Sequence, residues 1–207
     1  LGETLLETNG RTVTLDPMGA QNTPQAVVTP DDHVAMVWTD DRSGASRIYA
    51  QLISPTGERL WGDNGMMITE SEPLSQLDPR ISYHNDSFYI GWSEWEMIGT
   101  RFRYHVYGQR MQNTQKLWGP NGKMISILSG SELIQETKLA DVVEDFYVWS
   151  RVNPATNQFS VWTKRVDENG DAHTGWEDAG MRVSNDEGIT TQLSPVSKAT
   201  PQGIYVT

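Results

Sequence analysis

The chain has 207 residues, among them eight tryptophans and seven tyrosines, and carries a formal net charge of −11. The many aromatic residues exclude a disordered acidic tail, and the negative charge argues against nucleic-acid binding, which needs clustered positive charge. The lack of cysteine excludes disulfides and thiolate metal sites, and no apolar run approaches the ~20 residues of a membrane-spanning helix.

Four sets of landmark residues recur along the chain, with roughly 57 residues between successive members of each set. The members of the first set end apolar runs, and those of the second lie in the run that follows. The members of the third are tryptophans in turn segments, and the fourth set is the glutamines at the start of each unit. The sets are Trp38, Trp92 and Trp149; Tyr49, Tyr107 and Trp162; Trp61, Trp118 and Trp176; and Gln21, Gln76, Gln135 and Gln192. Their agreement predicts a repeat protein.

The repeats divide the chain into three full units, residues 21–75, 76–134 and 135–191. Residues 1–20 match the end of a preceding unit, and residues 192–207 match the start of a following one. We therefore expect the chain to be part of a longer protein. The alternative is that the two partial units close against each other as one shared unit, which would lack its third strand.

The first full unit predicts four short strands. Pro24 to Thr29 is β-prone, and His33 to Thr39 is a continuous apolar run, typical of a strand buried on both faces. Arg47 to Ile53 alternates between its two faces, and Met66 to Thr69 forms the fourth strand. Turn segments rich in Pro, Asp, Asn and Gly separate the strands, and the later units repeat the pattern.

Four antiparallel strands in a repeat of this length are typical of a β-propeller blade. We therefore predict an all-β fold, a β-propeller of four-stranded antiparallel blades that is an incomplete segment of a larger propeller. The recurring tryptophans would fill the contacts between blades. An array of β-sandwiches is the rival architecture, but a sandwich needs about seven strands and would not repeat at this period.

The motif series of the first unit is W-x-D-x-R at Trp38 to Arg42, I-Y-A-Q at Ile48 to Gln51, and L-W-G-x-x-G at Leu60 to Gly65. This series resembles the repeats of large secreted bacterial proteins, many from Bacteroidota and relatives, which often carry a type IX secretion sorting domain. The second unit departs from it at Ser93 to Glu96, and the third loses Tyr-x-Gln. The resemblance implies a secreted or cell-surface propeller and no defined activity.

Patterns that would mark catalysis or metal binding are weak. No string matches the S-x-D-x-G-x-x-W box of sialidases, which are also propellers, and no convergent Arg, Tyr and Glu set is marked. Asp167 to Asp171 offers oxygen ligands for calcium, but it aligns with an ordinary turn at Ser54 to Gly57, the interpretation we favour. Asp40 and Arg42 are expected to fix a turn. We therefore predict no catalytic residue, cofactor or metal.

The most informative irregularity is a longer connection in the second unit, from Glu94 to Tyr104. It joins the second and third strands, on the propeller face that commonly binds ligands. Its aromatic, Met and Arg residues are types enriched at interfaces. The candidate binding residues are Trp95, Met97, Arg101, Phe102 and Arg103. The alternative is that the extra residues only extend the hairpin.

These observations favour a non-catalytic recognition or scaffolding module of a larger secreted or cell-surface bacterial protein. Its partner would be a protein or a glycan bound at the propeller-face loops, within a larger surface or secretion complex. One alternative is a propeller glycoside hydrolase or sialidase-like enzyme whose catalytic residues lie in other blades. The other is a structural spacer in a surface assembly.

Overall fold

The computed structural model describes residues 10–15, 18–70, 74–99, 101–127, 137–153, 156, 158–183 and 195–207. Within these ranges all the regular elements are β-strands. In chain order they are β1 (Gln21–Val28), β2 (Val34–Asp40), β3 (Arg47–Ile53), β4 (Met66–Met67), β5 (Ser75–His84), β6 (Ser87–Ile98), β7 (Arg101–Gln112), β8 (Gln115–Lys116), β9 (Lys123–Met124), β10 (Thr137–Val143), β11 (Phe146–Asn153), β12 (Gln158–Arg165), β13 (Met181–Arg182), β14 (Ser197–Thr200) and β15 (Gly203–Val206).

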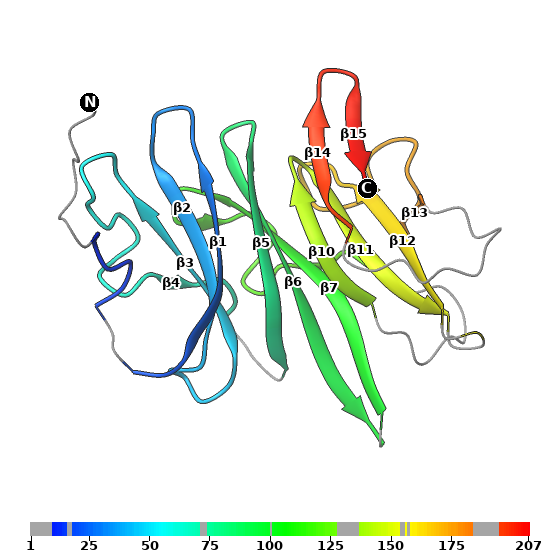
Figure 1. Ribbon diagram of the computed structural model, residues 1–207, viewed down its shortest axis with the longest axis horizontal. Coiled ribbons are helices and arrows are strands. Elements are labelled where there is room, and N and C mark those ends of the chain that lie inside the picture. The colour runs from blue at the N-terminus through cyan, green and yellow to red at the C-terminus, as the bar shows by residue number, and fades with distance from the viewer. Residues whose placement is uncertain are drawn as a thin grey trace.

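Antiparallel pairing joins the strands into consecutive sheets (Figure 1). The first sheet has the order β1-β2-β3-β4, the second β5-β6-β7-β8, and the third β10-β11-β12-β13, while β14 and β15 form a hairpin. β9 pairs with β7 at Tyr107 in the way that β4 pairs with β3 at Tyr49. The prediction of an all-β chain built from four-stranded antiparallel sheets is confirmed.

The first sheet shows how well the residue pattern locates the strands. β3 has the bounds expected from its alternation, and β2 is displaced by one residue from the predicted apolar run. β1 begins earlier than expected, at Gln21, because a register shift between Asn22 and Gln25 lets the chain pair on both sides of Pro24. Proline cannot donate to a strand ladder, so it is tolerated at such an irregularity.

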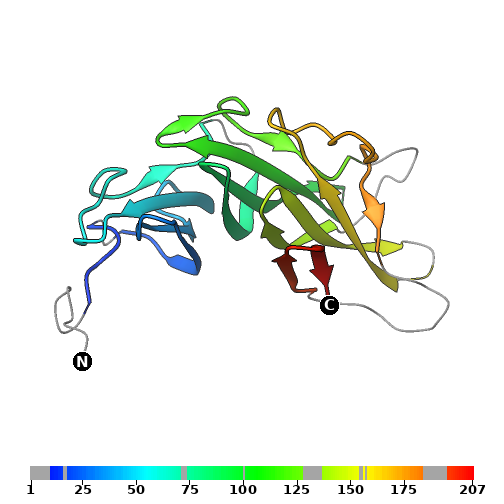
Figure 2. The same ribbon diagram turned by 90° about the horizontal axis from the view of Figure 1, so that it is seen from above.

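The sheets stand side by side along a curved row (Figure 2). The two faces of β6 and β7 supply the middle of two apolar cores, because side chains alternate across a strand. Trp92 and Ile90 pack with the first sheet, in a core that includes Val37 and Trp61. Tyr89 and Val106 pack with the third sheet, in a core that includes Trp149, among others.

Each full unit has a tryptophan that lies against a glycine of its outer turn. We use this name for the segment after the third strand of a unit that holds the L-W-G-x-x-G motif or its equivalent, residues 60–65 in the first unit and 117–122 in the second. A Cβ atom added to Gly65 would come within 2.7 Å of the Trp38 ring, and one added to Gly122 would come within 2.9 Å of the Trp92 ring. Both glycines have positive φ angles, of 71°, which favour glycine. The last glycine of the L-W-G-x-x-G motif is therefore required by the tryptophan of the W-x-D-x-R motif.

A buried side chain on the third strand fixes the same outer turn. The Nε2 atom of Gln109 donates to the Gly119 carbonyl at 2.7 Å, and its Oε1 accepts from the amides of Arg110 and Trp118 at 3.1 and 2.9 Å. Gln51 makes the equivalent bonds in the first sheet. In the third sheet Lys164 takes this place, and its Nζ donates to the Asp178 carbonyl at 3.1 Å. Burial lowers the pKa of Lys164.

Successive units are also joined by a recurring clasp at the outer edge. The amide of Glu70, after β4, donates to the Pro120 carbonyl of the second unit at 3.1 Å. The amide of Leu15 donates to the Asp63 carbonyl of the first unit at the same distance. The segment before β1 therefore lies against the first sheet much as the end of the first unit lies against the second.

Candidate functional site

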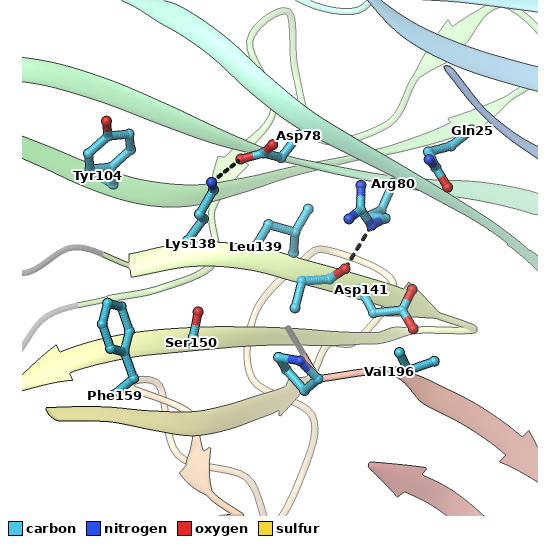
Figure 3. Close-up of a pocket in the computed structure, with 12 residues that line it drawn as sticks. Gln25, Asp78, Arg80, Tyr104, Lys138, Leu139, Asp141, Ser150, Phe159 and Val196 are labelled. Carbon is cyan, nitrogen blue, oxygen red and sulfur yellow. Dashed lines mark hydrogen bonds and ion pairs between the residues drawn. The ribbon is translucent and has the colours of Figure 1, made fainter. Parts of the chain in front are cut away.

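A cavity of about 640 Å³ opens between the second sheet, the third sheet and the β14–β15 hairpin (Figure 3). The first strands of successive sheets, β1, β5 and β10, lie next to one another and supply much of its wall. The lining residues are Gln25, Asp78, Arg80, Tyr104, Lys138, Leu139, Ala140, Asp141, Ser150, Phe159, Pro195 and Val196. This is a concave site with convergent polar groups, the usual form of a ligand pocket.

Irregular strand pairing places two carboxylates at the cavity wall. The register shifts between Leu77 and Arg80 in β5 and between Leu139 and Asp141 in β10. Asp78 lies within the first shift and has a φ of 53°, which is uncommon for a residue other than glycine. Bulges redirect side chains and often occur beside functional sites. Here they accompany the carboxylates of Asp78 and Asp141 at the wall.

Two cationic side chains bridge the second and third sheets at the cavity (Figure 3). Lys138 Nζ lies 3.5 Å from the Asp78 Oδ2 atom. Arg80 donates from Nε to the Ala140 carbonyl at 2.7 Å and from Nη1 to the Pro79 carbonyl at 2.9 Å. The two hydrogen bonds hold the Arg80 side chain in place, so its polar atoms are preorganised for a ligand, whereas the Lys138 side chain is 61% exposed and makes one ion pair.

Asp141 is held by the protein on both carboxylate oxygens. Its Oδ1 accepts from the Val142 amide at 2.9 Å. Its Oδ2 accepts from the amide and the hydroxyl of Ser197, at 2.9 and 2.6 Å. Asp141 therefore attaches the β14–β15 hairpin to the third sheet, and the hairpin forms one end of the cavity.

The cavity is balanced in charge although the whole chain is strongly acidic. Its two carboxylates are matched by Arg80 and Lys138. Tyr104 and Phe159 lie toward one end of the cavity, while Val196 lies toward the other (Figure 3). Paired donors and acceptors between apolar walls suit a neutral ligand rich in hydroxyl groups better than an ion.

The predicted binding loop is a continuation of the β6–β7 hairpin. The strands pair without interruption from Phe88 with Met111 to Ile98 with Arg101. Trp95, Met97 and Phe102 share one face with the cavity residue Tyr104, because side chains alternate. Trp95 and Phe102 meet edge to face with centroids 5.1 Å apart. The structure thus brings three of the five predicted residues to one face, and the side chain of Arg101 lies outside the described part.

Arg103 belongs to the opposite face of the hairpin. Its Nε donates to Glu96 Oε1 at 2.8 Å, and His105 Nε2 lies 3.8 Å from the same oxygen. Burial lowers the pKa of His105 and raises that of Glu94. Glu94 accepts from the Trp92 indole at 3.1 Å. Gln76 of β5 also donates to Glu94, and its Oε1 accepts from the Ile48 amide of the first sheet at 3.1 Å, so this charged face is directed toward the first sheet.

The Trp–carboxylate contact explains the W-x-D part of the repeat motif. Trp38 Nε1 donates to Asp40 Oδ2 at 2.9 Å, and Arg42 donates to both carboxylate oxygens. Burial alone would raise the pKa of Asp40, but the hydrogen bonds from Arg42 and Trp38 outweigh it and lower that pKa. The expected turn-fixing role of this pair is confirmed, and Glu94 takes the place of Asp40 in the second unit.

The acidic segment from Asp167 to Asp171, considered above as a possible calcium loop, is a turn. At the predicted turn, Asp167 Oδ1 accepts from the amides of Asn169 and Asp171, which is a turn arrangement. Across the described ranges, no three His, Asp or Glu side chains are grouped so that they could hold a metal ion. The same part of the chain contains no helix long and apolar enough to cross a membrane.

No protein-family model and no curated protein sequence matches the chain. Solved structures that are similar to it include a thermostable family-43 glycoside hydrolase and the endo-arabinase from Bacteroides thetaiotaomicron VPI-5482. Sequence identities are 14% and 13%, and the TM-score is 0.52 for both. The matches cover 90% and 93% of this chain, and 64% and 72% of the other two chains. These likenesses establish a shared β-propeller-like fold.

Sequence reasoning missed the cavity itself. Its walls come from different units: the first strands β1, β5 and β10 contribute residues, and Tyr104, Ser150 and Phe159 come from β7, β11 and β12. A signal was present in the repeat alignment. Asp78-Pro79-Arg80 carries charges where the first unit has Thr23-Pro24-Gln25. Charged residues in β5, a strand that lies between β1 and β10, indicate a polar site, because charged side chains are seldom buried without partners.

Proposed function

We propose that this chain binds a neutral carbohydrate in the cavity between its second and third sheets. The observation that carries the proposal is the charge-balanced polar wall beside the aromatic rings of Tyr104 and Phe159. Sugars combine hydroxyl groups with apolar C–H faces, so they can use the fixed polar atoms and the rings together. The similar fold of an endo-arabinase supports carbohydrate as the ligand class and makes arabinan the first probe.

Binding should be tested with the purified chain by affinity electrophoresis in gels that contain arabinan, galactan, xylan or a β-glucan. We expect at least one polymer to retard the protein. Tyr104→Ala should abolish the retardation, while Tyr205→Ala is the matched control, because Tyr205 is an exposed tyrosine that does not line the cavity. The proposal would be overturned if both variants were retarded equally. It would also be overturned if no polymer retarded the unaltered chain.

Hydrolysis is the second candidate function. It is supported by the two glycoside hydrolases that share the fold and by two carboxylates, those of Asp78 and Asp141, in one cavity. A glycosidase needs one carboxyl group as acid and another as base or nucleophile. Asp141 already accepts three hydrogen bonds from the protein and Asp78 is paired with Lys138. This engagement favours binding without cleavage.

The two functions separate in a reducing-end assay on the polymer that binds. Binding alone predicts no release of new reducing ends over prolonged incubation. Release that is lost in Asp78→Asn would establish hydrolysis instead. The predicted location, secreted or on a bacterial cell surface, stays a prediction, as does membership of a larger surface complex.

A further inference from the structure

The face of the β6–β7 hairpin that carries Trp95 continues from the cavity wall. Tyr104 lines the cavity, Trp95 is its cross-strand neighbour, and Phe102 lies two residues further toward the tip. This face is turned toward the third sheet, because the Ser93 hydroxyl on the same face accepts from the Leu139 amide at 2.9 Å. The aromatic residues therefore extend the apolar end of the cavity outward without a break.

The outer part of this face is accessible. Met97 is 64% exposed and Phe102 is 48% exposed, while Trp95 is half-buried. The other face of the hairpin carries ionisable side chains instead, those of Glu94, Glu96, Arg103 and His105. We refer to Tyr104, Trp95, Phe102 and Met97 as the aromatic strip.

We propose that the aromatic strip binds further sugar units of an extended, uncharged polysaccharide chain whose other units occupy the cavity. The proposal rests on the carbohydrate binding proposed above and deepens it, because it specifies a long chain in place of a short oligosaccharide. Two residues of a strand span about 6.8 Å, which adds room for one or two sugar rings beyond Tyr104. Sugar C–H faces pack on aromatic rings without requiring charge.

The size of the strip argues against a protein partner. Aromatic side chains bury about 150–250 Å² each when fully covered. With two of its members half-buried, the strip offers roughly 400 Å², whereas a stable protein interface needs about 800 Å² on each partner. A narrow strip that leads into a cavity fits a linear chain better than a second folded surface.

The experiment compares linear oligosaccharides, from the disaccharide to the octasaccharide, of the polymer that retards the chain in the gel assay, arabinan being taken first, by calorimetric titration of the full chain. We expect the octasaccharide to bind more tightly than the short oligosaccharides. Phe102→Ala and, separately, Trp95→Ala should weaken octasaccharide binding by roughly five- to tenfold and leave short-oligosaccharide binding unchanged. Glu96→Gln is the matched control, because Glu96 lies on the opposite face of the same hairpin, and it should bind both lengths as the unaltered chain does.

Several results would overturn the inference. Equal affinity for short and long oligosaccharides would overturn it. So would a Phe102→Ala variant that binds the octasaccharide as the unaltered chain does, or that binds both lengths more weakly by the same factor. Capture of a protein partner that depends on Phe102, with octasaccharide binding intact, would assign the strip to protein recognition instead. Failure of every length to bind would refute the carbohydrate proposal itself, and binding of short chains alone would refute only the strip.

Discussion

Replacing Gln109 by alanine tests the anchoring of the outer turn most directly. Gln109 is fully buried and makes three hydrogen bonds, one donated to the Gly119 carbonyl and two accepted from the amides of Arg110 and Trp118. Each buried polar group that loses its partner costs about 1–3 kcal/mol. Taking the lower value for each gives a loss of ~3 kcal/mol in the free energy of unfolding.

The loss should be read from urea unfolding followed by tryptophan fluorescence, together with a thermal melt. For a chain of this size ~3 kcal/mol corresponds to a fall in Tm of about 6–12 °C. Gln112→Ala is the matched control, because Gln112 lies on the same strand with an exposed side chain, and it should change stability by less than about 0.5 kcal/mol. A cost below about 1 kcal/mol for Gln109→Ala would refute the reasoning.

Three further substitutions follow from the same geometry. Gly122→Ala should destabilise the chain by ~2 kcal/mol or more, because the new Cβ would lie 2.3 Å from the Gly108 carbonyl at a φ of 71°; an unchanged melt would contradict the close approach. Lys164→Gln should raise stability at pH 7, since a neutral amide, as in Gln51 and Gln109, avoids the cost of burying a charge that lowers the pKa of Lys164; urea unfolding that shows a loss would contradict this. Burial also lowers the pKa of His105, so the unfolded chain takes up a proton first and stability should decline as pH falls below about 6.5. Unfolding at pH 7.5 and 5.0 should show that His105→Gln reduces this decline, and an unaltered pH dependence would refute it.

The sequence predicted the strands because each one is an apolar or alternating run bounded by turn residues. It also predicted the function of Asp40 and Arg42, since a carboxylate two residues before an arginine in a turn has few other partners. The third unit was harder to interpret, because Lys164 preserves the donor of Gln51 and Gln109 while changing the residue type. The preserved feature is a hydrogen bond from this side chain to a carbonyl of the outer turn. A sequence motif compares residue types, so it does not detect a hydrogen bond that a different residue type makes.

The candidate site was predictable only in part. The aromatic residues from Trp95 to Phe102 were identified by type, and the alternation of a hairpin then decides which of them share a face. The left-handed conformation of Asp78 and the bridge from Arg80 to the third sheet depend on contacts between units. No pattern within one unit contains that information, so the cavity required the structure.

The clasp that joins Glu70 to Pro120, and Leu15 to Asp63, bears on how the chain unfolds. Contacts of this kind act only between neighbours, so cooperativity is expected to run along one dimension, as in other repeat proteins. The second sheet has neighbours on both of its faces. Its amides in β6 and β7 should therefore exchange with solvent last, and opening should spread through the molecule one sheet at a time.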